Sequence, residues 1–566
     1  VTLPKIQFAN ADARGTVRVA WKTYEGAVAE QRFPGMLDLE GVLQQARAEQ
    51  VVRYLPLDLG RDALDYVGNA VRSGDIHNAR VRIQGDLNHV PFGRDSHGVD
   101  HPGIFRFEVP LSNAEYRFVP RYLQNVSDKP WPALTGLNGM LVIDKSSLSV
   151  LDATARFSTA PGIVVNNLSA HIPDLGHHLA VGIAADMRGP LEQALQLTKQ
   201  SPLSDILRNS LTQTTATGMA DISLTLGLPI MHMDVATVKG AVNLQDNDIR
   251  LSPGSPLLGK SRGRVAFDEK GFVLQDVTAS LLGGKAELKG GSLAADKNEN
   301  ARDVKVDVQG DFTAEGLRQE PAAGAMAQLG RFLNGRSAYR AVLEATPGSF
   351  ELTIDSDLDG MASNLPAPLG KNASGKLPFH YSNRVVKNTK SRNATDVAAE
   401  DELQVRIGQV VFAQYVRDVR NAEPPRVLRG RIGVGAQAVK EPPPMPGSGV
   451  RALVKMERVD ADAWSRALDS GWGRTLKPSA KQGANGNDAS ALATAAMGGY
   501  FPDQFVMQTP LFMLANRTFE SLVMDGSREG RLWKLSLSAR QLDGYVEYLQ
   551  SATGGPGGIK ARLNHL

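Results

Sequence analysis

The 566-residue sequence contains no cysteine and few aromatic residues, and its charges nearly cancel. Without cysteine, disulfide scaffolds, thiolate zinc sites and cysteine nucleophiles are excluded. The 63 Lys and Arg residues against 60 Asp and Glu residues leave a net charge of +3, which is too small for a general nucleic-acid-binding surface. No apolar run approaches the roughly 18 residues of a membrane span, and residues 1–4 lack the pattern of a signal segment. We therefore expect a soluble piece of a longer protein.

Short runs of alternating apolar and polar residues are abundant. Residues 79–84 place Ala79, Val81 and Ile83 on one face of a strand, and two arginines and a glutamine on the other. Turn-forming pairs such as Gly85-Asp86 separate such runs at intervals of about 8 to 12 residues, which is typical of antiparallel strands. Comparable runs lie at residues 105–109, 114–118, 148–150, 222–226, 242–244, 249–251, 304–308, 352–354, 405–407 and 532–539. The pattern predicts a mainly β chain.

A few segments interrupt the alternation. Helical spacing predicts short helices near residues 39–55, 62–73, 191–211, 313–333 and 460–468. Residues 383–401 are expected to be a flexible loop and residues 478–499 a flexible Ala/Gly-rich insert. Three consecutive prolines make residues 441–446 an extended connector. These interruptions divide the chain into β segments at residues 1–190, 191–345, 346–477 and 500–566, the last continuing into a missing C-terminal part.

The strands can be assembled in two ways. If about 40 strands of about 8 residues form one antiparallel sheet, it is roughly 190 Å long and about 27 Å wide. Such a sheet twists and curls to protect its apolar face, which leaves an elongated hydrophobic groove. The alternative is several closed sandwiches or barrels in series.

Motifs for catalysis or cofactor binding are incomplete. Residues 370–376 have phosphate-loop spacing, but Leu377 replaces the required Ser or Thr. Residues 433–438 begin like a dinucleotide-binding turn, but Ala438 replaces its third glycine. The histidines at residues 171–178 have no carboxylate at metal-ligand spacing. We therefore expect no enzyme activity, no catalytic residues, no metal and no cofactor.

Several segments, in this order, resemble the central region of the YhdP family of AsmA-like envelope proteins. No single segment is chemically specific, and it is their collinear order that carries the resemblance. The segments lie at residues 51–56, 63–67, 74–79, 85–92, 131–134, 172–175, 201–203, 242–247, 359–371 and 542–548. The family's N-terminal membrane helix and C-terminal portion are absent, and the insert near residues 480–499 is unusual. The resemblance implies a β-groove in the periplasm of a Gram-negative bacterium, anchored to the inner membrane in the full-length protein, through which phospholipids pass to the outer membrane.

This function requires only an apolar lining, because acyl chains need no precise polar constellation. The candidate lining residues are Val81, Ile83, Phe105, Phe107, Val109, Ile222, Leu224, Leu226, Val242, Leu244, Val306, Leu352, Ile354, Val405, Ile407, Leu535 and Leu537. The helices near residues 39–55 and 191–211 are expected to gate or cover the groove. The expected partners are phospholipids, the inner membrane, and outer-membrane or envelope proteins bound by missing parts of the chain, with no nucleic acid. Two alternatives stay open: a β-rich scaffold or adhesin that binds protein or glycan, and a hydrolase with a site assembled from distant residues.

Overall fold

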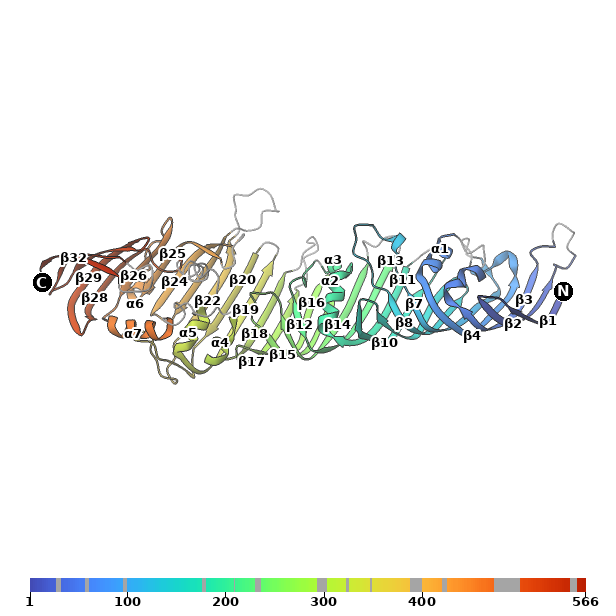
Figure 1. The fold of residues 1–566 in the computed structure, drawn as a ribbon, viewed down its shortest axis with the longest axis horizontal. Helices are drawn as coiled ribbons and strands as arrows, with labels where there is room; N and C mark the ends of the chain where they lie inside the picture. Colours follow the sequence, from blue (N-terminus) through green and yellow to red (C-terminus); the bar gives the residue numbers. More distant parts are fainter. Residues whose placement is uncertain are drawn as a thin grey trace, which may run out of the picture. The chain divides into compact units, whose positions relative to one another are not determined.

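The structure is a computed structural model. It describes residues 1–26, 32–55, 61–94, 99–175, 180–207, 209–229, 236–292, 303–321, 325–346, 349–386, 400–419, 425–472, 499–549 and 557–565. These residues are mainly β, and thirty of their strands belong to one mixed, unclosed sheet (Figure 1). The mainly β prediction is therefore confirmed. The chain divides into two compact units, residues 1–255 with 259–277 and residues 256–258 with 278–566.

The first unit is built from long strands that mostly pair with their sequence neighbours in antiparallel order. Its strands are β1 (Thr2–Ala9), β2 (Ala13–Lys22), β3 (Met36–Arg47), β4 (Val71–Asp86), β5 (Gly93–Arg94), β6 (Asp100–His101), β7 (Gly103–Tyr116), β8 (Leu134–Asp144), β9 (Ser147–Phe157), β10 (Ala160–Ile172), β11 (Ala180–Pro190), β12 (Thr215–Thr217), β13 (Met219–Pro229), β14 (Thr237–Arg250) and β15 (Leu258–Asp268). Strand β16 (Gly271–Leu281) runs from the first unit into the second.

The second unit continues the pattern with shorter strands. They are β17 (Gly284–Ser292), β18 (Val304–Thr313), β19 (Leu333–Thr346), β20 (Ser349–Ser356), β21 (Met361–Ser363), β22 (Phe379–Val386), β23 (Glu400–Ile407), β24 (Val411–Asp418), β25 (Arg426–Val434), β26 (Gly449–Lys455), β27 (Arg458–Asp460), β28 (Gln504–Leu514), β29 (Arg517–Glu529), β30 (Leu532–Ser538), β31 (Asp543–Leu549) and β32 (Gly558–His565).

Three strand pairs correct the prediction of a wholly antiparallel sheet. Strand β26 lies parallel to β25 and β28, and β27 lies parallel to β28. The cause of the first pair is the connection at residues 435–448, which contains a short helix followed by the expected extended, proline-rich connector. This connection carries the chain back along the length of β25 to the end of the sheet where β25 began. Strand β26 therefore runs in the same direction as β25.

The described helices are short. They include η2 (Ala48–Tyr54), α1 (Arg61–Ala70), η3 (Leu87–His89), η4 (Arg121–Leu123), α2 (Leu191–Gln200), α3 (Leu203–Ile206), α4 (Ala314–Gln319), α5 (Ala325–Leu329), η7 (Gly330–Phe332), α6 (Ala436–Lys440) and α7 (Ala461–Trp472). The predicted helices near residues 62–73, 191–211 and 460–468 correspond to α1, to α2 with α3, and to α7, with shifted ends.

The predicted helix at residues 39–55 is wrong over residues 39–47. These residues belong to β3, which is paired on both sides, with Leu39 opposite Val19 and Ile83. Residues four apart share a face in both a helix and a strand, so the spacing from Leu39 to Leu43 could not distinguish the two. Only residues 48–54 are helical, as the 3-10 helix η2.

The predicted helix at residues 313–333 is also corrected. Thr313 is the last residue of β18, and its hydroxyl caps the six-residue α4 by accepting from the Gly316 amide. Helix α4 ends before Pro321, whose ring is incompatible with a continuing helix. Residues 325–332 form α5 and η7, and the chain enters β19 at Leu333.

Several strands are longer than the expected 8 residues because predicted turns lie inside them. Strand β4 has 16 residues and β14 has 14. In β14 the predicted turn at residues 246–248 is an irregularity where Asp246 has φ of 61°. The fully buried Asn247 stabilises it, because its side chain accepts from the Gln245 amide and donates to the carbonyls of Thr217 and Met219. The strand therefore continues, and pairs first with β13 and then with β12.

The two predicted flexible segments are only partly described. Residues 383–386 and 400–401 belong to β22 and β23, so the loop prediction is wrong there. Their pairing partners in β20, β23 and β24 explain this, since each residue completes a ladder position. Residues 387–399 and residues 478–498 of the insert lie outside the described residues.

Candidate functional site

Apolar side chains of the first unit align across neighbouring strands to form one continuous face, here called the inner face. One row of directly opposed residues consists of Ile6, Val17, Gly41, Val81, Phe107, Ile143, Leu148 and Ile172. A second row consists of Val109, Leu141, Val150, Ala170, Ile183, Leu226 and Val238. Every strand crossed by a row contributes an apolar residue or glycine, so no polar side chain interrupts either row.

The opposite face of the sheet is polar. Cross-strand ion pairs on it include Arg106 with Asp144 at 2.6 Å and Arg188 with Asp221 at 3.1 Å. All four side chains are largely solvent-exposed, so these pairs contribute little to stability. Their importance here is that the charges of the alternating sequence lie away from the inner face.

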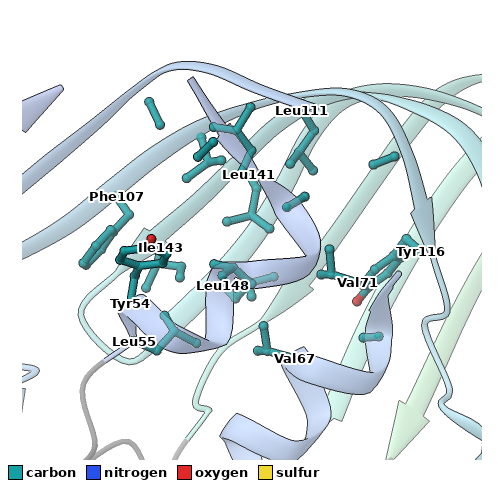
Figure 2. A pocket seen from close by; sticks show the side chains of 18 of the residues that line it. Tyr54, Leu55, Val67, Val71, Phe107, Leu111, Tyr116, Leu141, Ile143 and Leu148 are labelled. Atoms are coloured by element: carbon teal, nitrogen blue, oxygen red, sulfur yellow. The ribbon is translucent and has the colours of Figure 1, made fainter. Parts of the chain in front are cut away.

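A large apolar cavity lies against the inner face of the first unit. It holds about 1400 Å³ of empty space, part of it open to solvent. Strands β2, β3, β4, β7, β8 and β9 form one wall, and η2 and α1 form the other, with side chains from both walls pointing into the cavity (Figure 2).

Helix α1 is held against the sheet by a buried tyrosine. Tyr66 is 1% exposed, and its hydroxyl lies 2.9 Å from the Tyr116 hydroxyl and donates to the Phe118 carbonyl at 3.0 Å. Burial raises the pKa of Tyr66 well above its usual range, so the phenol stays protonated and can donate. Tyr66 therefore anchors α1 through its hydroxyl as well as by packing.

A second apolar cavity, with about 740 Å³ of empty space that includes open solvent, lies further along the same face. It shares Tyr116, Leu137 and Val150 with the first cavity, so the two are adjacent. Leu197 of α2 and Leu203 of α3 line it together with residues of the strands. Two helical covers, η2 with α1 and α2 with α3, thus enclose parts of the inner face.

The second unit has an inner face of the same kind. One row runs through Leu288, Val308, Ala341, Ile354, Tyr381, Val405, Ala413, Ile432, Ala452, Phe505, Gly526, Leu535, Val546 and Ala561. A second row runs through Phe379, Ile407, Val411, Val434, Val454, Met507, Met524 and Leu537. Both rows pass through the parallel strands without loss of apolar character.

All seventeen candidate residues lie on these inner faces. Val81, Ile83, Phe105, Phe107 and Val109 meet on β4 and β7. Ile222, Leu224, Leu226, Val242 and Leu244 meet on β13 and β14. In the second unit, Val306 and Leu352 lie in the row next to that of Ile354, Val405 and Leu535, and Ile407 and Leu537 lie in the row through Phe379.

Sequence reasoning missed part of the cavity wall and all of the anchoring tyrosines. Leu141, Ile143, Leu148 and Val150 line the larger cavity, and their alternation was a usable signal. Tyr66 carried no such signal, because its role depends on a hydroxyl from a distant strand.

One polar cluster interrupts the inner face of the second unit. Arg417 donates from Nε and Nη2 to the carboxylate of Asp401 at 2.8 and 2.5 Å, and from Nη1 to the Tyr500 hydroxyl at 3.0 Å. The two charged side chains are 10% and 4% exposed. Burial alone would lower the pKa of Arg417, but these hydrogen bonds raise it, so the guanidinium remains charged.

Metal-ligand clusters and membrane-spanning helices were sought among the described residues. No group of three or more potential metal ligands occurs among them. No helix in the same residues has the length and apolar character required to cross a membrane.

The open sheet, its uninterrupted apolar rows and its cavities define a β-groove protein with an apolar inner face. The family model described as YhdP protein matches residues 1–566, and the chain belongs to this family. The intermembrane phospholipid transporter YhdP of Escherichia coli (strain K12) is 27% identical over 361 residues, which is 62% of this chain and 26% of that protein. The chain thus spans about a quarter of the length of this relative. No solved structure gives a significant match.

Proposed function

We propose that this chain is a segment of a bridge-like lipid transport protein that carries phospholipids along its inner face without a chemical step. The observation that carries the proposal is the apolar cavity on the inner face of the first unit, where strands β4, β7 and β8 align apolar residues. Each buried methylene contributes about 0.8 kcal/mol, so an acyl chain gains enough from this surface without any specific polar contact. The seventeen candidate residues would form part of the lining.

The proposed setting is the periplasm of a Gram-negative bacterium. The printed name of the relative, an intermembrane phospholipid transporter, supports this setting and the phospholipid cargo. In this proposal other parts of a longer protein contact the inner membrane, through a transmembrane helix, and the outer membrane or its proteins. Transport between the two membranes would maintain the permeability barrier of the outer membrane.

The test is native mass spectrometry of the purified chain, with lipid extraction and identification. The variant Leu224→Asp places a carboxylate in the smaller cavity, where an unpaired charge facing hydrocarbon is costly. The matched control is Thr225→Asp, because Thr225 is exposed on the polar face of the same strand, opposite Lys239.

We expect phospholipid on the parent and on Thr225→Asp, and its loss from a folded Leu224→Asp. A parent without lipid and with a dry, filled interior would contradict the proposal and favour a scaffold. Equal lipid on both variants would show that this part of the inner face does not bind lipid.

A further inference from the structure

The polar cluster on the inner face of the second unit has unused hydrogen-bonding capacity. Asp401 and Arg417 are directly opposed on β23 and β24, one ladder step beyond the apolar pair Leu403 and Tyr415. A step of two residues along a strand is about 6.8 Å. The cluster therefore lies immediately beside the apolar surface that the proposed function assigns to acyl chains.

The Arg417 guanidinium has N–H groups without an acceptor among the described residues. A guanidinium has five N–H groups. Asp401 and Tyr500 accept from three of them, and no acceptor for the other two occurs among the described residues. The ion pair thus leaves Arg417 able to bind a further oxygen.

Two neighbouring side chains on β22 also lack partners. The Asn383 side-chain oxygen is buried without a hydrogen-bond partner, and its amide orientation could equally present the NH₂ group. The Tyr381 hydroxyl makes no hydrogen bond to the described residues, and it lies close enough to Arg417 and Asp401 for both to influence its pKa. A buried polar group is normally satisfied. The unpartnered Asn383 oxygen, in the row next to that of Asp401 and Arg417, therefore indicates a missing ligand.

We propose that Arg417, Tyr381 and Asn383 form a contact site for the phosphodiester of a lipid headgroup. Guanidinium N–H groups and hydroxyl or amide donors match phosphate oxygens, which accept only. Asp401 holds the guanidinium in place and balances its charge, and Tyr500 fixes its orientation. This inference rests on the proposed function and adds that the second unit contacts the headgroup as well as the chains.

The test uses the whole chain with vesicles of phosphatidylethanolamine and phosphatidylglycerol. Two photoactivatable probes carry the same diazirine acyl chain, one on a phospholipid and one on diacylglycerol, which has no phosphate. Labelled peptides from β22 to β24 are quantified by mass spectrometry. We expect the phospholipid to label these strands about tenfold more than diacylglycerol, the ratio for one charge-assisted hydrogen bond.

Removal of Arg417 alone would leave Asp401 buried and unpaired, so the test variant is the double substitution Asp401→Leu/Arg417→Met, which replaces the pair by apolar side chains. The matched control, Asp307→Leu/Arg340→Met, removes the exposed ion pair on the polar face of the same unit. The phospholipid preference should fall to about one in the test variant and persist in the control. Circular dichroism and urea unfolding establish that both variants are folded.

A folded test variant that retains the preference would overturn the inference, as would a parent without one. If millimolar inorganic phosphate abolishes the preference, the site takes free phosphate and not a lipid headgroup. Labelling of the inner face without headgroup preference would refute only this inference, whereas absence of labelling by either probe would also refute the proposed function.

Discussion

The Tyr66 hydroxyl is the contact that most directly links the α1 cover to the sheet, and Tyr66→Phe removes it without changing the shape of the ring. The substitution leaves the Phe118 carbonyl and the Tyr116 hydroxyl without this partner. A buried polar group that loses its partner costs about 1–3 kcal/mol, so we expect about 2 kcal/mol of lost stability. That corresponds to roughly a 30-fold larger equilibrium constant for opening of the cover.

Amide hydrogen exchange followed by mass spectrometry measures this opening. Peptides from residues 61–70 should exchange about 30-fold faster in Tyr66→Phe, while peptides from β28 to β30 should be unchanged. Tyr54→Phe is the matched control, because Tyr54 lies on the same cover but its hydroxyl accepts an exposed hydrogen bond, from the Asn10 side chain. A change below about twofold at residues 61–70, or an equal change in the control, would refute the role of the Tyr66 hydroxyl as an anchor.

Three further predictions concern stability. Phe105→Ala should lower the free energy of unfolding, measured by urea denaturation, by about 3–5 kcal/mol, because Phe105 is 1% exposed and packs on Phe107. The control Ile104→Ala, on the exposed face, should lower it by less than about 1 kcal/mol. Asn247→Ala should cost about 2–3 kcal/mol in the same assay, since it leaves buried backbone groups unpaired; a cost below about 0.5 kcal/mol would contradict this role. Hydrogen bonds from the Asn516 and Ala515 amides lower the pKa of Asp462 below 3.8, so its stabilisation is complete above about pH 4 and is lost as the pH falls through the lowered value. The stability difference between the parent and Asp462→Asn should therefore be present at neutral pH and vanish in acid, and a difference independent of pH would contradict it.

The faces of single strands could be predicted from the sequence because they depend on local periodicity. Val81 and Ile83 lie on the inner face because alternate residues of a strand share a side. The same reasoning could not separate helix from strand at Leu39, where the spacing suited both. The antiparallel direction of most strands followed from the short connections. It failed for β26 and β27, and the long connection from β25 to β26 returns the chain to the end of the sheet where β25 began.

The polar parts of the inner face could not be predicted, since they depend on contacts between distant residues. Asp401 was placed in a flexible loop, and Arg417 was one of many arginines in the sequence. They meet only because the register of β23 and β24 opposes them. Tyr500, which lies 83 residues beyond Arg417 in the sequence, accepts a hydrogen bond from its guanidinium. No local sequence pattern predicts this contact.

The parallel pairing of β25, β26 and β28 affects how a chain of this kind can change length during evolution. In an antiparallel meander, successive strands run in opposite directions. A strand can therefore be gained or lost only together with its neighbour, because one added strand would leave the chain at the opposite end of the strands. Insertion of one hairpin adds about 9.6 Å and one residue pair to each row, and existing contacts keep their register. A connection such as residues 435–448, which allows two neighbouring strands to be parallel, removes the need to add or lose strands in pairs. With such a connection, the apolar face can lengthen or shorten by one strand, about 4.8 Å, at a time.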